Sequence, residues 1–278
     1  MINVVGLGKT GCLIVDSLSE LDSNYKPYKI GEKLAKSKNT RSIPKQKTAE
    51  KYEEKCPSLA YFFKQVRGES FFFVDGSELI SAASLKVLSD MDNKKTTVFY
   101  LQPDYEHMGG DAERNERVVF HVLQEYARSG VFADIFLISK VKMEEALGNI
   151  SPIDYDHTIA SAVASSVNLI NYFSKTESIV GTDNTPKDHE KIKTIGLVSY
   201  KDSLEKAFFD LNIIVNKKYY YGMKEEELRT DNELLKKIRE QVNKLSGEAS
   251  SSYDVFPTDY EEPHVVCVLT TSVIQERK

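Results

Sequence analysis

Cysteines and long apolar runs are both scarce in this sequence, and each absence excludes a class of protein. The three cysteines, Cys12, Cys56 and Cys267, are odd in number and widely separated, so neither a disulfide framework nor a zinc site is predicted. No apolar stretch approaches the roughly 18 residues that span a bilayer, and the first residues lack a basic region followed by a cleavable hydrophobic core. We therefore expect buried thiols, no membrane partner and a cytoplasmic location.

An excess of positive charge is also missing. The chain has 37 Lys and Arg residues against 42 Asp and Glu residues, a net charge of −5. This balance argues against a general binder of nucleic acid. The five histidines do not pair on one helix face, so no metal site is predicted from them. A length of 278 residues with 41% hydrophobic content permits one large α/β domain or two smaller ones.

A glycine-containing stretch, residues 2–21 (INVVGLGKTGCLIVDSLSEL), stands between a predicted strand and a predicted helix. Gly6, Gly8 and Gly11 fit the spacing G-x-G-x-x-G, which dinucleotide-binding folds share with ordinary tight turns. Glycine permits positive φ and close approach of a ligand, and a helix N-terminus offers free N–H groups and a positive dipole end. The stretch predicts a phosphate-binding loop; the alternative is a tight strand-to-helix turn.

The next part of the chain alternates strands and helices. Predicted strands cover residues 25–30, 70–74, 96–101 and 132–139, and predicted helices cover residues 49–66, 81–91, 112–128 and 142–147. The polar residues 31–48 are interpreted as a loop. This alternation predicts a parallel sheet flanked by helices on both faces, with a ligand crevice at the carboxyl ends of the strands.

A long amphipathic helix is predicted at residues 152–173, and a polar run at residues 174–191 is the clearest boundary. Beyond it the pattern becomes rich in strands, at residues 194–200, 211–221, 253–256 and 265–274, with one charged helix at residues 224–245. We expect a nucleotide-binding α/β domain at residues 1–151, a central helix at residues 152–175, and a smaller mixed α/β domain at residues 176–278.

This order of elements resembles the tubulin and FtsZ family of GTP-binding polymer proteins. The resemblance extends over the whole chain in element order but only over short pieces in residues. The first loop looks like the family's first nucleotide loop, which implies nucleotide-binding roles for Gly6, Gly8, Lys9, Thr10, Gly11 and Cys12. Residues 74–85 (VDGSELISAASL) take the place of the family's glycine-rich phosphate signature.

That second loop departs from the family pattern. The family uses a run of glycines whose N–H groups wrap the phosphates, whereas here only Gly76 remains, with Ser77, Ser81 and Ser84 as hydroxyl donors. Side chains at the missing glycine positions hold a backbone away from phosphate, so the departure predicts that triphosphate binding is weakened or lost.

Other roles are implied by the resemblance alone. Tyr155 and His157 lie where the family stacks the guanine base, and Arg114 lies where it contacts phosphate or sugar. An acidic helix start and a solvated helix beginning explain the same residues. Asp183 and Asp188 correspond to the acidic loop that positions the attacking water against a neighbouring subunit's GTP, although a polar linker has the same composition.

The leading hypothesis is a tubulin/FtsZ-like protein that binds GTP or GDP and assembles head-to-tail with itself, with weak or absent GTPase activity; an active member would hold GTP with Mg²⁺ between subunits. One alternative is an NAD(P)-binding Rossmann oxidoreductase, for which Glu32 is the acidic residue nearest the end of the second strand. The other is an interaction scaffold that binds no nucleotide.

Overall fold

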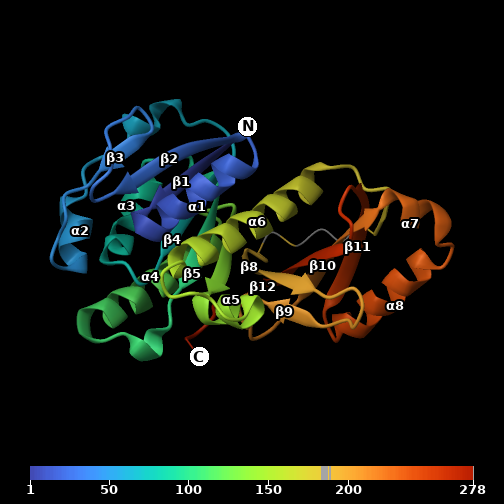
Figure 1. Cartoon of the computed structure of the whole chain (residues 1–278). Coiled ribbons are helices and arrows are strands. Elements are labelled where there is room, and N and C mark those ends of the chain that lie inside the picture. The colour runs from blue at the N-terminus through green and yellow to red at the C-terminus, as the bar shows by residue number, and fades with distance from the viewer. Residues whose placement is uncertain (183–186, 188, 278) are drawn as a thin grey trace.

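In the computed structural model, which describes residues 1–182, 187 and 189–277, one 12-stranded sheet runs through both halves of the chain (Figure 1). Its strand order is β3-β2-β1-β4-β5-β6-β8-β12-β10-β11-β7, with β9 paired to β8 at the side. The long helix α6 (Tyr155–Lys175) crosses between the two halves (Figure 1). None of the helices in the described ranges is long and apolar enough to cross a membrane.

The first half of the sheet is entirely parallel. Its strands are β1 (Ile2–Leu7), β2 (Tyr25–Gly31), β3 (Thr40–Ser42), β4 (Ser70–Asp75), β5 (Thr96–Gln102) and β6 (Asp134–Ser139). Every residue of β4 is buried, with Phe71 and Phe73 facing one core cluster and Phe72 and Val74 the other. A strand covered on both faces needs apolar residues at every position, which explains the continuous apolar runs.

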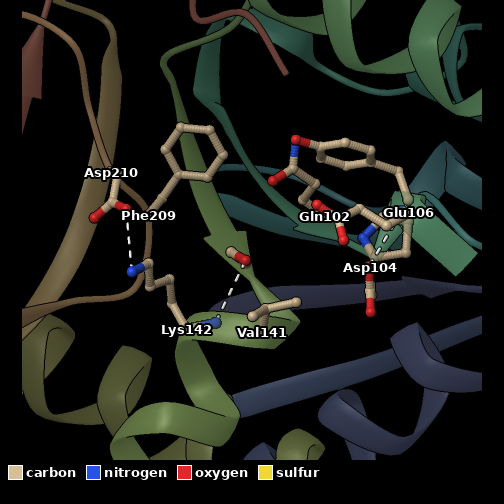
Figure 2. A pocket seen from close by; sticks show the side chains of 10 residues that line it. Gln102, Asp104, Glu106, Val141, Lys142, Phe209 and Asp210 are labelled. Atoms are coloured by element: carbon tan, nitrogen blue, oxygen red, sulfur yellow. Dashed lines mark hydrogen bonds and ion pairs between the residues drawn. The ribbon is translucent and has the colours of Figure 1, made fainter. Parts of the chain in front are cut away.

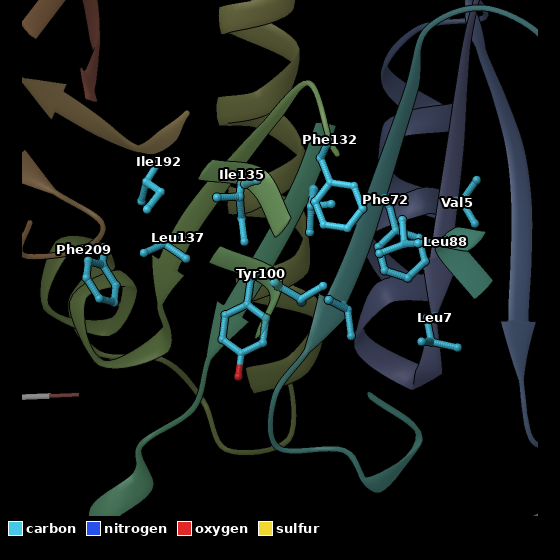
Figure 3. Close-up of a cluster of buried hydrophobic side chains, with 14 of the residues drawn as sticks. Val5, Leu7, Phe72, Leu88, Tyr100, Phe132, Ile135, Leu137, Ile192 and Phe209 are labelled. Carbon is cyan, nitrogen blue, oxygen red and sulfur yellow. The ribbon is translucent and has the colours of Figure 1, made fainter. Parts of the chain in front are cut away.

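Helices cover both faces of this half. On one face α1 (Gly8–Leu21) packs against α6, where Ile14 and Leu18 share a core cluster with Ile159 and Val163. The other face carries α2 (Ala49–Lys55), the 3₁₀ helices η1 (Phe62–Gln65) and η2 (Leu79–Ala83), α3 (Ser84–Ser89) and α4 (Gly110–Arg128). Figure 3 shows part of this second cluster. The short helix α5 (Lys140–Leu147) follows β6.

The second half of the sheet is mixed. Its elements are β7 (Val180–Gly181), β8 (Ile192–Val198), β9 (Glu205–Ala207), β10 (Asn216–Lys224), α7 (Glu225–Thr230), α8 (Leu234–Ser246), β11 (Ser250–Thr258) and β12 (His264–Thr271). β12 runs antiparallel to both β8 and β10, whereas β10 and β11 are parallel. β8 joins the halves because it pairs with β6 through Ile135↔Ile192 and Phe136↔Lys193.

Several predicted segments differ from the structure, and three of these differences have a clear physical cause. The helix predicted at residues 49–66 ends at Lys55, two residues before Pro57, because proline has no N–H to continue it. The single helix predicted at residues 224–245 is wrong: α7 and α8 are separated at Asp231, whose carboxylate accepts a hydrogen bond from the Glu233 N–H. The loop predicted at residues 31–48 contains β3, a short edge strand beside β2.

Candidate functional site

The turn between β1 and α1 has the shape of an anion-binding loop. Gly8 has a φ of +83°, which an L side chain rarely adopts. The backbone is also tightly folded on itself, because a Cβ on Gly6 would overlap the Gly11 carbonyl and a Cβ on Gly11 would overlap the Phe73 carbonyl. Each of the three glycines therefore has a steric reason to stand in this turn, and the first N–H groups of α1 have no partner within the helix.

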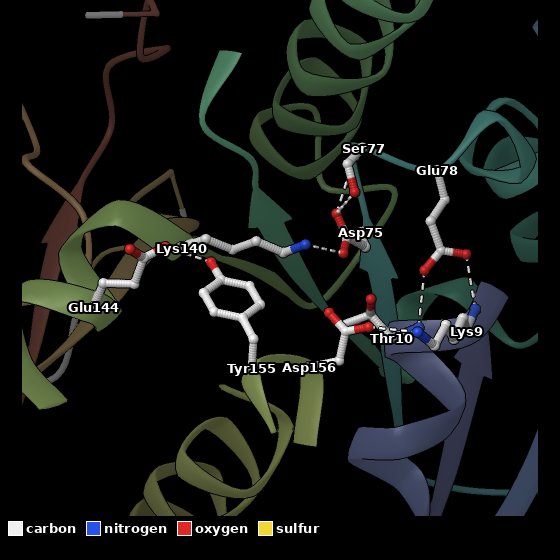
Figure 4. Close-up of polar contacts among 9 residues, drawn as sticks. All are labelled: Lys9, Thr10, Asp75, Ser77, Glu78, Lys140, Glu144, Tyr155 and Asp156. Atoms are coloured by element: carbon white, nitrogen blue, oxygen red, sulfur yellow. Dashed lines mark hydrogen bonds and ion pairs between the residues drawn. The ribbon is translucent and has the colours of Figure 1, made fainter. Parts of the chain in front are cut away.

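Those N–H groups are already bound by a side chain of the same molecule. One carboxylate oxygen of Glu78 accepts a hydrogen bond from the Lys9 N–H at 2.7 Å, and the other accepts one from the Thr10 N–H at 2.8 Å (Figure 4). Burial raises the pKa of Glu78 above its ordinary value, while the two N–H groups act in the opposite direction. The N-terminus of α1 therefore carries an internal carboxylate.

The turn after β4, which bears Glu78, is held by side chains. The backbone N–H and the hydroxyl of Ser77 donate to the Asp75 carboxylate at 2.9 and 2.7 Å, and Asp75 forms a buried ion pair with Lys140 (Figure 4). A Cβ on Gly76 would overlap the Tyr100 hydroxyl. The Ser77 hydroxyl is thus used within the turn, and Gly76 fits because its neighbour leaves no space for a side chain.

The start of α6 contacts the first loop through an ion pair. The ammonium of Lys9 pairs with Asp156 at 2.5 Å, and the hydrogen bond and charge of Asp156 raise the pKa of Lys9. The Tyr155 hydroxyl donates to Glu144, and burial is the main cause of its raised pKa (Figure 4). His157 is exposed on the first turn of α6. The structure thus brings Lys9, Thr10 and Tyr155 to one polar edge.

Of the remaining predicted residues, Cys12 lines a cavity beside the first loop, whereas Arg114 lies elsewhere. Cys12 is buried, its thiol donates to the carbonyls of Gly6 and Ile30 at 3.7 Å, and burial raises its pKa to about 12. Arg114 is exposed at the start of α4 and pairs with Asp111 at 3.2 Å. The residues proposed to position water, Asp183 and Asp188, both lie outside the described residues.

Two cavities open near the carboxyl ends of the parallel strands. A cavity of about 430 Å³ lies beside the first loop, lined by Gly8, Lys9, Glu32 and Glu78 among others. A second, of about 230 Å³, lies at the ends of β5 and β6 between Gln102, Lys142 and Asp210 (Figure 2). Within residues 1–182, 187 and 189–277, no group of three or more His, Cys, Asp or Glu side chains could hold a metal ion.

Sequence reasoning missed Glu78, which is the side chain that determines the character of the site. An acidic residue two positions after Gly76, in the place of the family's glycine-rich signature, was the available signal. Its partners Lys9 and Thr10 lie 69 and 68 residues earlier, so only the pairing of β1 with β4 brings them together.

A parallel sheet with a glycine loop after its first strand, joined by one long helix to a mixed sheet, defines a class of two-part α/β protein. No family model matches the sequence, and no curated protein matches it in sequence. Solved structures do match: the chain has a tubulin/FtsZ-like fold, which confirms the expectation from element order.

The similarity extends over nearly the whole chain at low sequence identity. The FtsZ dimer of M. jannaschii has a TM-score of 0.70 and 14% identity, covering 97% of this chain and 88% of that chain. The GTPγS-bound protofilament of CetZ2 from Haloferax volcanii has a TM-score of 0.71 and 12% identity, covering 96% and 92%. The GTPγS-form protofilament of TubZ from Bacillus thuringiensis serovar israelensis has a TM-score of 0.67 and 13% identity, covering 97% and 87%.

Proposed function

We propose that this protein associates head-to-tail with copies of itself and that this association requires neither bound GTP nor its hydrolysis. The observation that carries the proposal is the extent of the fold match. Structures described as an FtsZ dimer and as TubZ and CetZ2 protofilaments match this chain across the parallel sheet, the long helix and the mixed sheet together. The fold match covers 96–97% of this chain, so it includes the two opposite ends of the molecule that a head-to-tail contact would use.

The geometry of α6 supports a head-to-tail arrangement. The helix has 21 residues, so its ends are separated by about 31 Å at about 1.5 Å per residue. An apolar side chain is strongly exposed just before one end and just after the other: Ile153 is 89% exposed and Ile179 is 57% exposed. Surfaces at opposite ends of one molecule form a heterologous contact, which leads to open chains unless it closes into a ring.

The contacts of the first loop and of the turn after β4 support independence from GTP. GTP or GDP is the ligand that the fold implies, but the donors expected to hold phosphates are engaged within the molecule, Lys9 and Thr10 through Glu78 and Ser77 through Asp75. The residues present therefore do not fit a nucleotide triphosphate in this conformation. No hydrolytic step is assigned.

The oxidoreductase alternative receives no support from the residue on which it depended. Glu32 accepts a hydrogen bond from the Tyr52 hydroxyl and lies 3.8 Å from the Lys45 ammonium. An acidic residue that binds ribose hydroxyls needs its oxygens free for them.

Sedimentation velocity over a concentration series, with and without GTP, tests the proposal. We expect the distribution of sedimentation coefficients to shift to higher values and to broaden as concentration rises, equally with and without GTP. Ile153→Asp should shift it toward monomer, because a charge replaces an apolar contact, whereas Val118→Asp is the matched control on the outer side of α4, where Val118 is 60% exposed. A single sharp monomer at every concentration would reject self-association, and oligomers that need GTP would reject nucleotide independence.

A further inference from the structure

The first turn of α1 has the properties of a phosphate site but holds a carboxylate. A helix N-terminus combines free N–H groups with the positive end of the helix dipole, and both favour an anion. In this molecule Glu78 supplies that anion, with each carboxylate oxygen bound to a different N–H group, those of Lys9 and Thr10. The negative charge that such a loop requires is therefore already present.

The carboxylate also occupies the space that the glycine leaves open. A Cβ added to Gly8 would overlap a carboxylate oxygen and the carboxyl carbon of Glu78. The absence of a side chain at Gly8 thus serves the approach of Glu78, as it would serve the approach of a phosphate. A phosphate placed there would meet both the atoms and the negative charge of this group.

The turn that carries Glu78 is fixed before any ligand arrives. Asp75 is bound by the Ser77 N–H and hydroxyl and by the ammonium of Lys140, and the Glu78 N–H donates to the Asp75 carbonyl at 3.3 Å. The Ser81 N–H in turn donates to the Glu78 carbonyl at 2.9 Å. These contacts hold the backbone on both sides of Glu78, so its side chain reaches α1 from a fixed position.

We propose that Glu78 is a built-in substitute for a nucleotide phosphate: it closes the glycine loop of this protein, and a phosphate group binds there only when the carboxylate is removed. This inference deepens the proposed function by naming what makes it independent of nucleotide. It rests on that proposal only for its biological meaning, since its test measures anion binding and not assembly.

Calorimetric titration with inorganic pyrophosphate and with GDP tests the inference on three proteins: wild type, Glu78→Ala, and the matched control Glu145→Ala on the exposed side of α5. We expect Glu78→Ala to bind pyrophosphate about tenfold or more tightly than the other two, because its Lys9 and Thr10 N–H groups lose a competing charged acceptor. GDP should follow the same order if the crevice also accepts a nucleoside. Equal pyrophosphate affinity in all three proteins would overturn the inference.

A second measurement covers the case in which Glu78→Ala does not fold. Hydrogen exchange of the Lys9 and Thr10 amides, followed by NMR, should be at least about tenfold faster in the isosteric variant Glu78→Gln than in wild type, because a neutral acceptor binds an N–H less strongly than a carboxylate. Amides farther along α1 should keep their rates. Unchanged exchange at Lys9 and Thr10 would show that Glu78 does not hold the loop and would overturn the inference.

If Glu78→Ala binds pyrophosphate and still assembles without nucleotide, both proposals stand. If it binds pyrophosphate but the wild type proves to be a monomer, the substitution of phosphate by Glu78 remains while the proposed function fails. The two ideas are thus separable by experiment.

Discussion

The turn after β1 and the turn after β4 lie side by side at one edge of the sheet, but they are built by different means. The first depends on backbone geometry: Gly8 has positive φ, and Gly6 and Gly11 permit backbone contact. The second depends on side chains, with Asp75 binding Ser77 and Lys140, and Glu78 reaching across to α1. The comparison indicates that the N–H donors of a turn built by its backbone can be satisfied by a side chain from a neighbouring turn.

The largest effect on the free energy of unfolding is expected from the buried ion pair that holds the second turn. The Asp75 side chain is 0% exposed and the Lys140 side chain 12%, so Lys140→Met leaves a buried carboxylate without its counter-ion. We expect a loss of about 3–5 kcal/mol in the free energy of unfolding, measured by urea denaturation. Lys142→Met on the same helix is the control: the Lys142 side chain is 32% exposed in its ion pairs, so its replacement should cost about 1 kcal/mol or less. Equal losses would contradict the special role of Asp75.

A pair of glycine variants tests the backbone basis of the first turn. Gly8 and Gly68 both have a φ of +83°, but a Cβ on Gly68 meets nothing within 4 Å, whereas one on Gly8 overlaps Glu78. Gly68→Ala should therefore cost about 1 kcal/mol from backbone strain alone. Gly8→Ala should cost about 3 kcal/mol, because it also displaces the carboxylate from its N–H donors. Chemical denaturation measures both; similar costs would mean that the contact with Glu78 contributes nothing.

In the second turn, the cost of replacing the glycine is expected to come from packing and not from backbone strain. A Cβ on Gly76 would overlap the Tyr100 hydroxyl and come within 3.1 Å of the Glu116 Cγ atom. Gly76→Ala should cost about 2 kcal/mol by overpacking. In a Tyr100→Phe background, where the overlapping oxygen is gone, the same substitution should cost less. A double-mutant cycle by thermal or chemical denaturation measures the difference, and additive losses would argue against the steric explanation.

The smallest effect concerns the charge of Glu78. Its pKa is raised from the ordinary 4.5, chiefly by burial, so the folded protein binds this proton more readily than the unfolded chain does. The contribution of Glu78 to stability is therefore full below the unfolded pKa and declines as pH rises through the folded pKa. As pH rises above the ordinary pKa of 4.5, wild type should lose free energy of unfolding relative to Glu78→Gln. Denaturation of both proteins over a pH series that starts near this value is the measurement; parallel curves would exclude a raised pKa for Glu78.

Sequence patterns predicted the strands and helices in which buried positions recur at regular spacing over several residues. β4 and β5 were visible as apolar runs because both faces of the parallel sheet are covered, and α6 was visible from its helical spacing of apolar residues. β3, β7 and β9 were missed because two or three residues form too short a pattern, and their pairing depends on neighbouring strands.

By itself, the sequence determined the glycine turn after β1, since only glycine adopts the positive φ of Gly8 and the close backbone approaches of Gly6 and Gly11 at little cost. Only the tertiary structure decided what fills that turn. β1 pairs with β4 directly, and this pairing places Glu78 against N–H groups that lie 68 and 69 residues away in the chain. A carboxylate satisfies those donors and the helix dipole as a phosphate does, and no local pattern in the sequence contains that contact.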